Sequence, residues 1–471
     1  MILTLTLAAA LAAQPSPGET AVTVTAESGE ETAAYRGAFD VPEHRADPDS
    51  RTITLSYVRF PATTDTPGDP IVYLAGGPGG SGSRTAQGRR FALFQAMRAH
   101  GDVIAFDQRG TGASTGLPEC RTDITVPADL AEPADPLQAA YRRAAMTCRE
   151  FWAGQGVAVA GYTTLESVAD LSDLRRHLGA ERLDLWGISY GTHLALAAMK
   201  TIPAELDQII LASAEGLGQT VKRPARADAF YARLGEAVAG QPEAAARYGD
   251  LVALMRRVQD RLAVEPVAMT LEGPQGEPVE FLFTRDHLRM ISGWASDPGR
   301  AGWILDLYAS LDAGETGMAR AVAQRAFDPG APITLSAMST IMDVASGISP
   351  DRRARFELEA AGSLVGPYLN FPMPQLAGVW PDIDLGEAFR EEAAYDGPVL
   401  LLTGTLDGRT FPEGQSEATA GLSDLTRVTV VNAGHNLFMA SPQVGAAMHA
   451  FMGGEAVASE IVVEPPDFAR R

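Results

Sequence analysis

The sequence predicts an α/β fold built on a doubly wound, mostly parallel sheet. Short and nearly continuous apolar runs recur along the chain, each stopped by glycine or a polar residue, as in strands buried on both faces of a parallel sheet. They are DPIVYLAGGPGG, GDVIAFDQRG, RLDLWGIS, DQIILASAEG, GPVLLLTGTLD and TRVTVVNAGH. Segments with helical patterns, such as 88–100, 164–180 and 192–206, fall between the earlier runs, as a doubly wound architecture requires.

Two segments differ from this alternation. Residues 51–62, RTITLSYVRFPA, alternate and are rich in β-branched side chains, which predicts a half-buried strand of an edge hairpin. Residues 217–385 contain amphipathic helical patterns and no comparable strand run. We therefore expect residues 14–216 and 386–471 to form the core, and residues 217–385 to form a mostly helical cap at the carboxyl ends of the strands, where ligands bind in such sheets.

The composition is that of a compact globular protein. The chain has 471 residues, of which 46% are hydrophobic, so it is long enough for two domains or for one domain with a large insertion. Its 38 basic and 59 acidic residues give a formal net charge of -21, which repels nucleic acid and anionic lipid. Nucleic acid is therefore not expected as a partner, and the oligomeric state stays open.

The first residues resemble a secretory signal peptide. Residues 1–13, MILTLTLAAALAA, are apolar and end in small side chains before a polar, proline-containing stretch, although an apolar first strand is the alternative. In an exported protein Cys120 and Cys148 can form one disulfide; the alternative is two buried thiols. No later apolar run is long enough to predict a membrane span.

GISYG, residues 187–191, matches the nucleophile pattern G-x-S-x-G. Glycines two positions before and after Ser189 allow a sharp backbone turn, so that the serine projects above the sheet. The pattern alone is common, and the alternative is a tight corner that needs small residues. Because an apolar strand precedes it and a small-residue helix follows, we predict that Ser189 is a nucleophile.

His435 is the predicted general base. It follows a strand-like run at a glycine-containing loop near the end of the chain, which places it beside the serine turn. His193 lies one helical turn after Ser189, but nothing nearby orients its ring, and we expect a structural or pocket-wall role. The other histidines lack such a context, and we expect them to be solvated; they are His44, His100, His177, His287 and His449.

Asp407 is the predicted third member, because it follows a buried strand and completes the chain order Ser, Asp, His. Asp107 is the alternative acid, but it precedes Ser189 and is expected to stabilise a turn with Arg109. The glycine-rich loop after the first buried run offers backbone N–H groups for an oxyanion, and we choose Gly77 and Tyr190 as the donors. A phosphate-binding loop is the rival interpretation, but the loop contains no lysine.

These motifs together resemble the proline iminopeptidase and tripeptidyl aminopeptidase branch of the α/β-hydrolases. The resemblance rests on GGPGGSG, DQRGTGAS, GISYGT, TGTLD and AGH and covers most of the predicted core. It implies an α/β-hydrolase fold with a helical cap and a serine exopeptidase acting on peptides with a free amino terminus, without a metal or organic cofactor. The sequence departs from the family at Ala75, where histidine is usual, at Gly408 and Arg409, and in lacking further cysteines.

An aminopeptidase needs an anion for the ammonium group of its substrate, and Glu215 is the predicted one. It follows the last strand before the cap, although a rim or helix-capping role is the alternative. Asp343 and the acids of residues 357–359 are further candidates. Two other functions stay open, namely a carboxylic-ester hydrolase with the same catalytic residues and a non-catalytic binding protein on the same scaffold.

Overall fold

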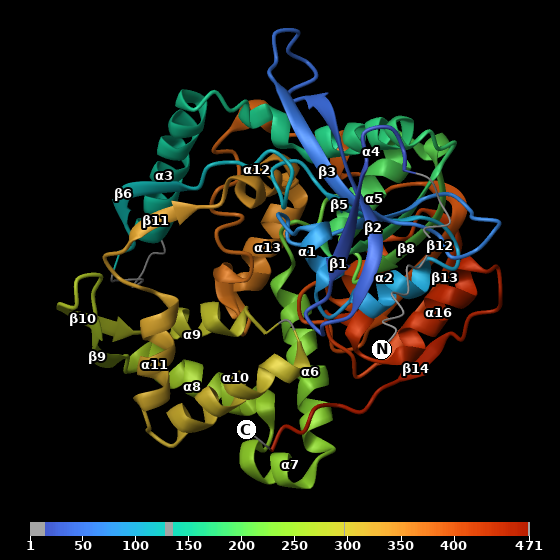
Figure 1. Cartoon of the computed structure of the whole chain (residues 1–471). Helices are drawn as coiled ribbons and strands as arrows, with labels where there is room; N and C mark the ends of the chain where they lie inside the picture. Colours follow the sequence, from blue (N-terminus) through green and yellow to red (C-terminus); the bar gives the residue numbers. More distant parts are fainter. Residues whose placement is uncertain (1–14, 128–134, 296, 470–471) are drawn as a thin grey trace, which may run out of the picture.

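The computed structural model describes residues 15–127, 135–295 and 297–469 (Figure 1). Its centre is a sheet in the order β1-β2-β3-β5-β4-β7-β8-β12-β13-β14. These strands are β1 (Thr20–Thr25), β2 (Glu31–Pro42), β3 (Thr52–Phe60), β4 (Ile71–Leu74), β5 (Val103–Asp107), β7 (Leu183–Ile188), β8 (Leu206–Ala212), β12 (Tyr395–Gly404), β13 (Leu422–Val431) and β14 (Glu460–Val462). The strands from β5 to β14 in this order run parallel, which confirms the predicted mostly parallel sheet.

The prediction for residues 51–62 was wrong in one respect. They form β3 as expected, but β3 is an inner strand that pairs antiparallel with β2 on one side and with β5 on the other. Residues 20–42 form β1 and β2, which extend the sheet outward, so β1 is the edge strand.

Helices cover both faces of the sheet, which is why its inner strands are apolar on both sides. On one face, α4 (Thr164–Leu178) and α5 (Tyr190–Thr201) pack against the strands in one buried cluster. On the other face, α2 (Phe91–Met97) and α16 (Pro442–Met452) belong to a second cluster. The short helices α1 (Gly82–Gln87) and α15 (Pro412–Ala418) follow β4 and β12 and lie near the carboxyl ends of the strands.

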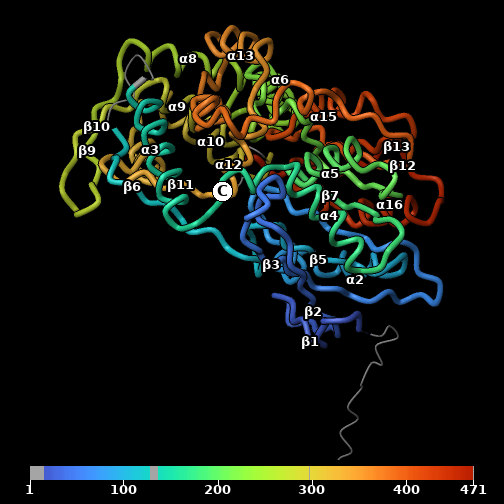
Figure 2. Tube along the Cα trace, turned by 90° about the horizontal axis from the view of Figure 1, so that it is seen from above, coloured from blue at the N-terminus to red at the C-terminus, as the bar shows by residue number. Residues whose placement is uncertain are grey.

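The chain between β8 and β12 forms a separate layer, seen at the left and bottom of Figure 1 and turned in Figure 2. Its elements are α6 (Pro224–Ala239), α7 (Pro242–Tyr248), α8 (Leu251–Val264), β9 (Val267–Glu272), β10 (Pro278–Phe283), α9 (Arg285–Ser292), α10 (Pro298–Asp312), α11 (Gly317–Ala326), β11 (Pro332–Leu335), α12 (Ala337–Ser346) and α13 (Pro350–Gly362). The short helix α14 (Glu387–Arg390) lies in the same stretch of chain, but its Phe389 packs in the cluster of α4 and α5. Helices α6 to α11 and the β9-β10 hairpin share an apolar cluster of their own, into which Phe468 of the C-terminal segment also packs.

A segment from before the serine turn joins this layer. Strand β6 (Cys120–Thr125) pairs with β11, and α3 (Asp135–Gly154) packs with both strands and with α12. Cys120 and Cys148 are joined in a disulfide that ties β6 to α3. The layer over the sheet is thus built from two separate stretches of the chain.

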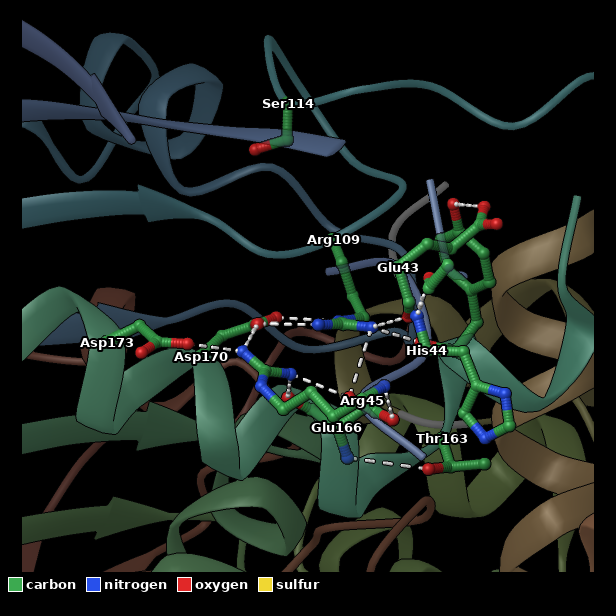
Figure 3. A network of polar contacts seen from close by, with 12 residues as sticks. Glu43, His44, Arg45, Arg109, Ser114, Thr163, Glu166, Asp170 and Asp173 are labelled. Carbon is green, nitrogen blue, oxygen red and sulfur yellow. Dashed lines mark hydrogen bonds and ion pairs between the residues drawn. The ribbon is translucent and has the colours of Figure 1, made fainter. Parts of the chain in front are cut away.

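Arg109, in the loop after β5, and its neighbours form a buried polar network (Figure 3). Its guanidinium is fully buried and donates two hydrogen bonds to Asp170 of α4. It also donates to the backbone oxygens of Glu43 and Gly161. Arg109 therefore fastens α4 to the loop after β5, and its carboxylate partner is Asp170. Asp107 does stabilise the turn, through the backbone N–H of Ala113, but not together with Arg109 as expected.

The predicted leader, residues 1–13, lies outside the described residues. Of the helices that the structure describes, none combines the length and the apolar character needed to cross a bilayer.

Candidate active site

Ser189 stands on a strained turn between β7 and α5. Its backbone has φ 55 and ψ -126, a conformation that non-glycine residues adopt at a cost of about 1–3 kcal/mol and that clusters at functional sites. Ser189 is half-buried and lines a pocket of about 400 Å³ at the carboxyl ends of the strands. The side chain therefore projects from the corner toward open space.

The glycines on both sides of Ser189 are required by close approach of the backbone. A Cβ at Gly187 would lie 2.7 Å from the oxygen of Gly191, and a Cβ at Gly191 would lie 2.0 Å from the oxygen of Leu74. Any larger residue at either position would push α5 away from β4 and β7. The spacing in GISYG is thus a packing requirement of this turn.

His435 and Asp407 meet beside the serine turn. The Nδ1 atom of His435 lies 3.1 Å from both carboxylate oxygens of Asp407. Thr410 and Gln415 also donate to this carboxylate, at 2.8 and 3.2 Å. The backbone N–H groups of Arg409 and Thr410 add two more bonds to it.

Asp407 is held in its charged form. Its side chain is fully buried, and burial alone would raise its pKa, but the neighbouring His435 ring and the hydrogen bonds from residues 409 and 410 lower the pKa well below its usual range. A charged, immobile carboxylate at Nδ1 leaves Nε2 as the ring nitrogen that can exchange a proton with a substrate or nucleophile.

The loop DGRTFP is shaped by the cap. A Cβ at Gly408 would lie 2.2 Å from the backbone oxygen of Ala295, so this position has no room for a side chain. The departure from the family pattern at Gly408 therefore accompanies a close cap contact, while Arg409 points outward and lines the pocket.

Two backbone N–H groups are available for an oxyanion. Among the described residues, those of Gly77 and Tyr190 donate to no protein acceptor. Gly77, Ser189 and His435 line the same pocket, and a Cβ at Gly76 would lie only 3.1 Å from the Cβ of Ser189. The glycine-rich loop therefore lies directly against the serine.

The structure brings Ser189 and His435 to one pocket, but among the described residues no hydrogen bond joins the Ser189 hydroxyl to the imidazole. Catalytic hydrogen bonds are often long before a substrate binds. Arg90, which the sequence did not suggest, lines this pocket too, and it donates to Asn436 at 2.7 Å and to the hydroxyl of Tyr73. It thereby secures the residue that follows His435.

Glu215 is not a free anion. Its carboxylate lies 2.7 Å from Nζ of Lys222, and both side chains are buried. Burial would raise the pKa of Glu215, but the Lys222 ammonium lowers it. Lys222 is one of only two lysines in the chain and follows Glu215 by seven residues, which is the signal in the sequence for this pair.

Asp343 is the other carboxylate of this region. It lies on α12, whose Met342 contacts the hydroxyl of Tyr190 at 3.0 Å and whose Ser346 hydrogen-bonds to His193. Among the described residues, Asp343 has no hydrogen bond or ion pair to its carboxylate. Burial and the nearby Glu215 raise the pKa of Asp343 to about 7. It is therefore the less compensated acid beside the serine turn.

The remaining histidines do not join the site. His193 is buried, both of its ring nitrogens are hydrogen-bonded, and burial lowers its pKa, as expected for a structural residue. The expectation of solvent exposure was wrong for His287, which is buried among cap phenylalanines and caps α9. The other four, His44, His100, His177 and His449, are half-buried, and the rings of His100 and His449 hydrogen-bond to each other. Among the residues with assigned positions, no cluster of His, Cys, Asp or Glu is arranged to hold a metal ion.

Comparisons with known proteins agree with this architecture. The model of the alpha/beta hydrolase fold matches residues 69–262. Serine protease Hip1 of Mycobacterium tuberculosis is 31% identical over 188 residues, which cover 38% of this chain and 35% of that protein. Tripeptidyl aminopeptidase of Streptomyces lividans is 28% identical over 186 residues, which cover 38% of this chain and 34% of that protein. A probable proline iminopeptidase of Streptomyces coelicolor is 32% identical over 148 residues, which cover 31% of this chain and 32% of that protein. The matches thus span about a third of the length of each relative.

Proposed function

We propose that this chain, which has the α/β-hydrolase fold, is a serine peptidase that cleaves residues from the free amino terminus of peptides. Ser189 attacks the carbonyl carbon while Nε2 of His435 takes the hydroxyl proton, and Asp407 orients the ring and stabilises its charged form. His435 then gives the proton to the leaving amine as the C–N bond breaks. Water attacks the acyl-enzyme by the same route, which frees the released residues and restores Ser189.

The pairing of His435 with Asp407 beside a strained serine is the observation that carries this proposal. Such a pair sets the tautomer that a serine hydrolase needs. The free N–H groups of Gly77 and Tyr190 support a role as oxyanion donors. The relatives named as a serine protease and as aminopeptidases support a peptide substrate.

We assign the recognition of the substrate ammonium to the acidic cluster of Glu215 and Asp343. The Lys222 ammonium balances Glu215, so the uncompensated charge of this pair of acids comes from Asp343. The backbone N–H of Glu215 donates to the hydroxyl of Thr192 in α5, and α12, which carries Asp343, contacts Tyr190 through Met342, so both residues lie near the serine turn. A substrate ammonium bound beside Asp343 would supply the opposite charge that this carboxylate lacks.

We also propose that the chain is exported. The disulfide between Cys120 and Cys148 supports an oxidising compartment, and the leader-like residues 1–13 support passage to it.

Arylamide substrates with one, two or three residues test the proposed function. We expect hydrolysis of at least one of these with a free amine, and a loss of about tenfold or more in kcat/KM when the amine is acetylated, since a charged contact is worth about 1.5–3 kcal/mol. The same panel should include short acyl esters as controls. Equal rates on blocked and free peptides, together with faster ester hydrolysis, would instead identify a carboxylic-ester hydrolase.

The pH dependence of substrate binding tests the assignment of Asp343. Its carboxyl has a pKa of about 7, so it is protonated and neutral below that pH and charged above it. The α-amino group of the substrate titrates at about pH 8, so KM is expressed as the concentration of the protonated amine. On that scale we expect KM for free-amine substrates to rise as the pH falls from 8 to 6, while KM for blocked substrates stays level. Replacing Asp343→Asn should raise KM at pH 8 and flatten the profile. A profile that keeps its slope in D343N would contradict the assignment.

A further inference from the structure

We propose that Asp107 and Gln108 are positioning residues that hold the oxyanion loop, residues 75–83, against Ser189. The inference rests on the proposed function, because it concerns the N–H groups that stabilise the oxyanion in that reaction. Asp107 is the last residue of β5 and Gln108 follows it directly, and the two residues bind opposite ends of the loop. In the described parts of the chain, no hydrogen bond joins either side chain to Ser189, so they act through the loop.

Gln108 holds the start of the loop. Its side chain is buried, and Nε2 donates to the backbone oxygen of Ala75 at 3.2 Å. Ala75 has only a methyl side chain and cannot anchor itself by a polar contact. The next residue, Gly76, lies against Ser189 and closes the loop by accepting a hydrogen bond from Gly80 at 3.0 Å.

Asp107 holds the end of the loop. One carboxylate oxygen accepts from the hydroxyl of Ser81 at 2.7 Å and from the backbone N–H of Ser83 at 3.0 Å. The other accepts from the hydroxyl of Ser83 at 2.6 Å and from the N–H of Ala113 at 2.9 Å. Three of its four hydrogen bonds thus go to the loop and one to its own turn.

Burial of the Asp107 carboxylate lowers the stability of the fold unless these hydrogen bonds are made. Its side chain is fully buried, and the donors to its carboxylate are all neutral groups. Arg109, the nearest cation in sequence, is engaged with Asp170 instead (Figure 3). A buried carboxylate without a cationic partner is a poor way to gain stability alone, which favours a role in geometry.

The loop needs an external brace because of its composition. Five of the seven residues from 76 to 82 are glycines, which have the largest conformational freedom of any residue. Oxyanion donors act well only when they are oriented before the reaction, within about 3 Å of the developing charge. Attachment of both ends to Asp107 and Gln108, at the carboxyl end of β5, supplies that orientation, and the close contact of Gly82 with the backbone of Phe106 adds to it.

The test replaces the two hydroxyls that Asp107 binds. We expect the full chain with Ser81→Ala and Ser83→Ala to lose about tenfold or more in kcat on the best free-amine arylamide. Complete loss of one oxyanion donor lowers kcat by about 10²–10³, and a misplaced donor should cost a part of that. KM should stay within about twofold. A boronic acid matched to that substrate forms a tetrahedral adduct on the serine, and its Ki should rise by the same factor as kcat falls. Gln108→Met, which keeps the shape and removes the donor, should act in the same direction.

Ser114→Ala is the matched control. The Ser114 hydroxyl donates to the backbone oxygen of Asp107 and accepts from the N–H of Ser56, so it stabilises the same turn without touching the loop. We expect this variant to lower the melting temperature while kcat and the boronic acid Ki stay within about twofold. If the S81A/S83A variant loses only melting temperature, as S114A does, the bracing role is overturned. If the unmutated protein hydrolyses none of the panel and Ser189 is not labelled, the proposed function fails, and this proposal fails with it.

Discussion

Replacing Ser189→Ala is expected to lower kcat by a factor on the order of 10⁶, because serine and histidine act as one unit in such sites. The variant should also lose covalent labelling by a fluorophosphonate, since the attacking oxygen is gone. Asp407→Asn should cost about 10⁴ in kcat, because the amide favours the wrong tautomer of His435. Kinetics on the best arylamide and mass spectrometry of the labelled peptide measure both effects.

The exposed Ser28 provides a control for Ser189. Ser28→Ala should keep full activity and labelling, because this residue lies in a loop between β1 and β2. Labelling that persists in S189A would contradict the assignment of the nucleophile. An unmutated protein that neither reacts with the probe nor hydrolyses any substrate would indicate a non-catalytic binding protein.

Replacing Glu215→Gln is expected to destabilise the fold by about 3–5 kcal/mol, the usual cost of leaving one member of a buried ion pair alone. The 2.7 Å contact between Glu215 and Lys222 is buried on both sides, so the ammonium would find no compensating water. Equilibrium unfolding in urea, followed by circular dichroism, measures the loss. Glu215→Gln combined with Lys222→Met should recover most of it, since the uncompensated charge is removed.

Asp343→Asn is the matched comparison for this effect. Asp343 has a raised pKa and no ion pair among the described residues, so its replacement should leave stability nearly unchanged or raise it slightly. If E215Q instead keeps its stability and only raises KM for free-amine substrates, Glu215 itself is the receiver of the ammonium. The two variants thus separate a structural pair from a binding group.

Local patterns in the sequence were sufficient for the serine turn and the inner strands. The apolar runs predicted the strands β4, β5, β7, β8 and β12, because strands covered on both faces are nearly continuously apolar. Strand β13 was also predicted, although its residues are only partly buried. His435 and Asp407 were paired by position alone, since the carboxyl ends of neighbouring parallel strands meet at one edge.

The edge of the sheet and the surroundings of single polar side chains were harder to predict from the sequence. The sequence predicts an edge hairpin at residues 51–62 because it does not identify β1 and β2, which the structure places outside β3 in the sheet. His287 is polar by type yet is buried in the cap, because its ring caps α9 and stacks on phenylalanines that periodicity does not identify. Burial of a single polar side chain depends on what packs over it.

The sequence by itself determined the doubly wound sheet, the turn at Ser189 and the chain order of the candidate catalytic residues, because backbone strain, strand burial and strand order are local or topological properties. The tertiary structure alone decided the partners of the charged groups. Asp107 binds the glycine-rich loop, Arg109 binds Asp170, and Glu215 binds Lys222, which leaves Asp343 as the less compensated acid. Charges attract over several ångströms in all directions, so a pairing follows from packing and not from spacing along the chain.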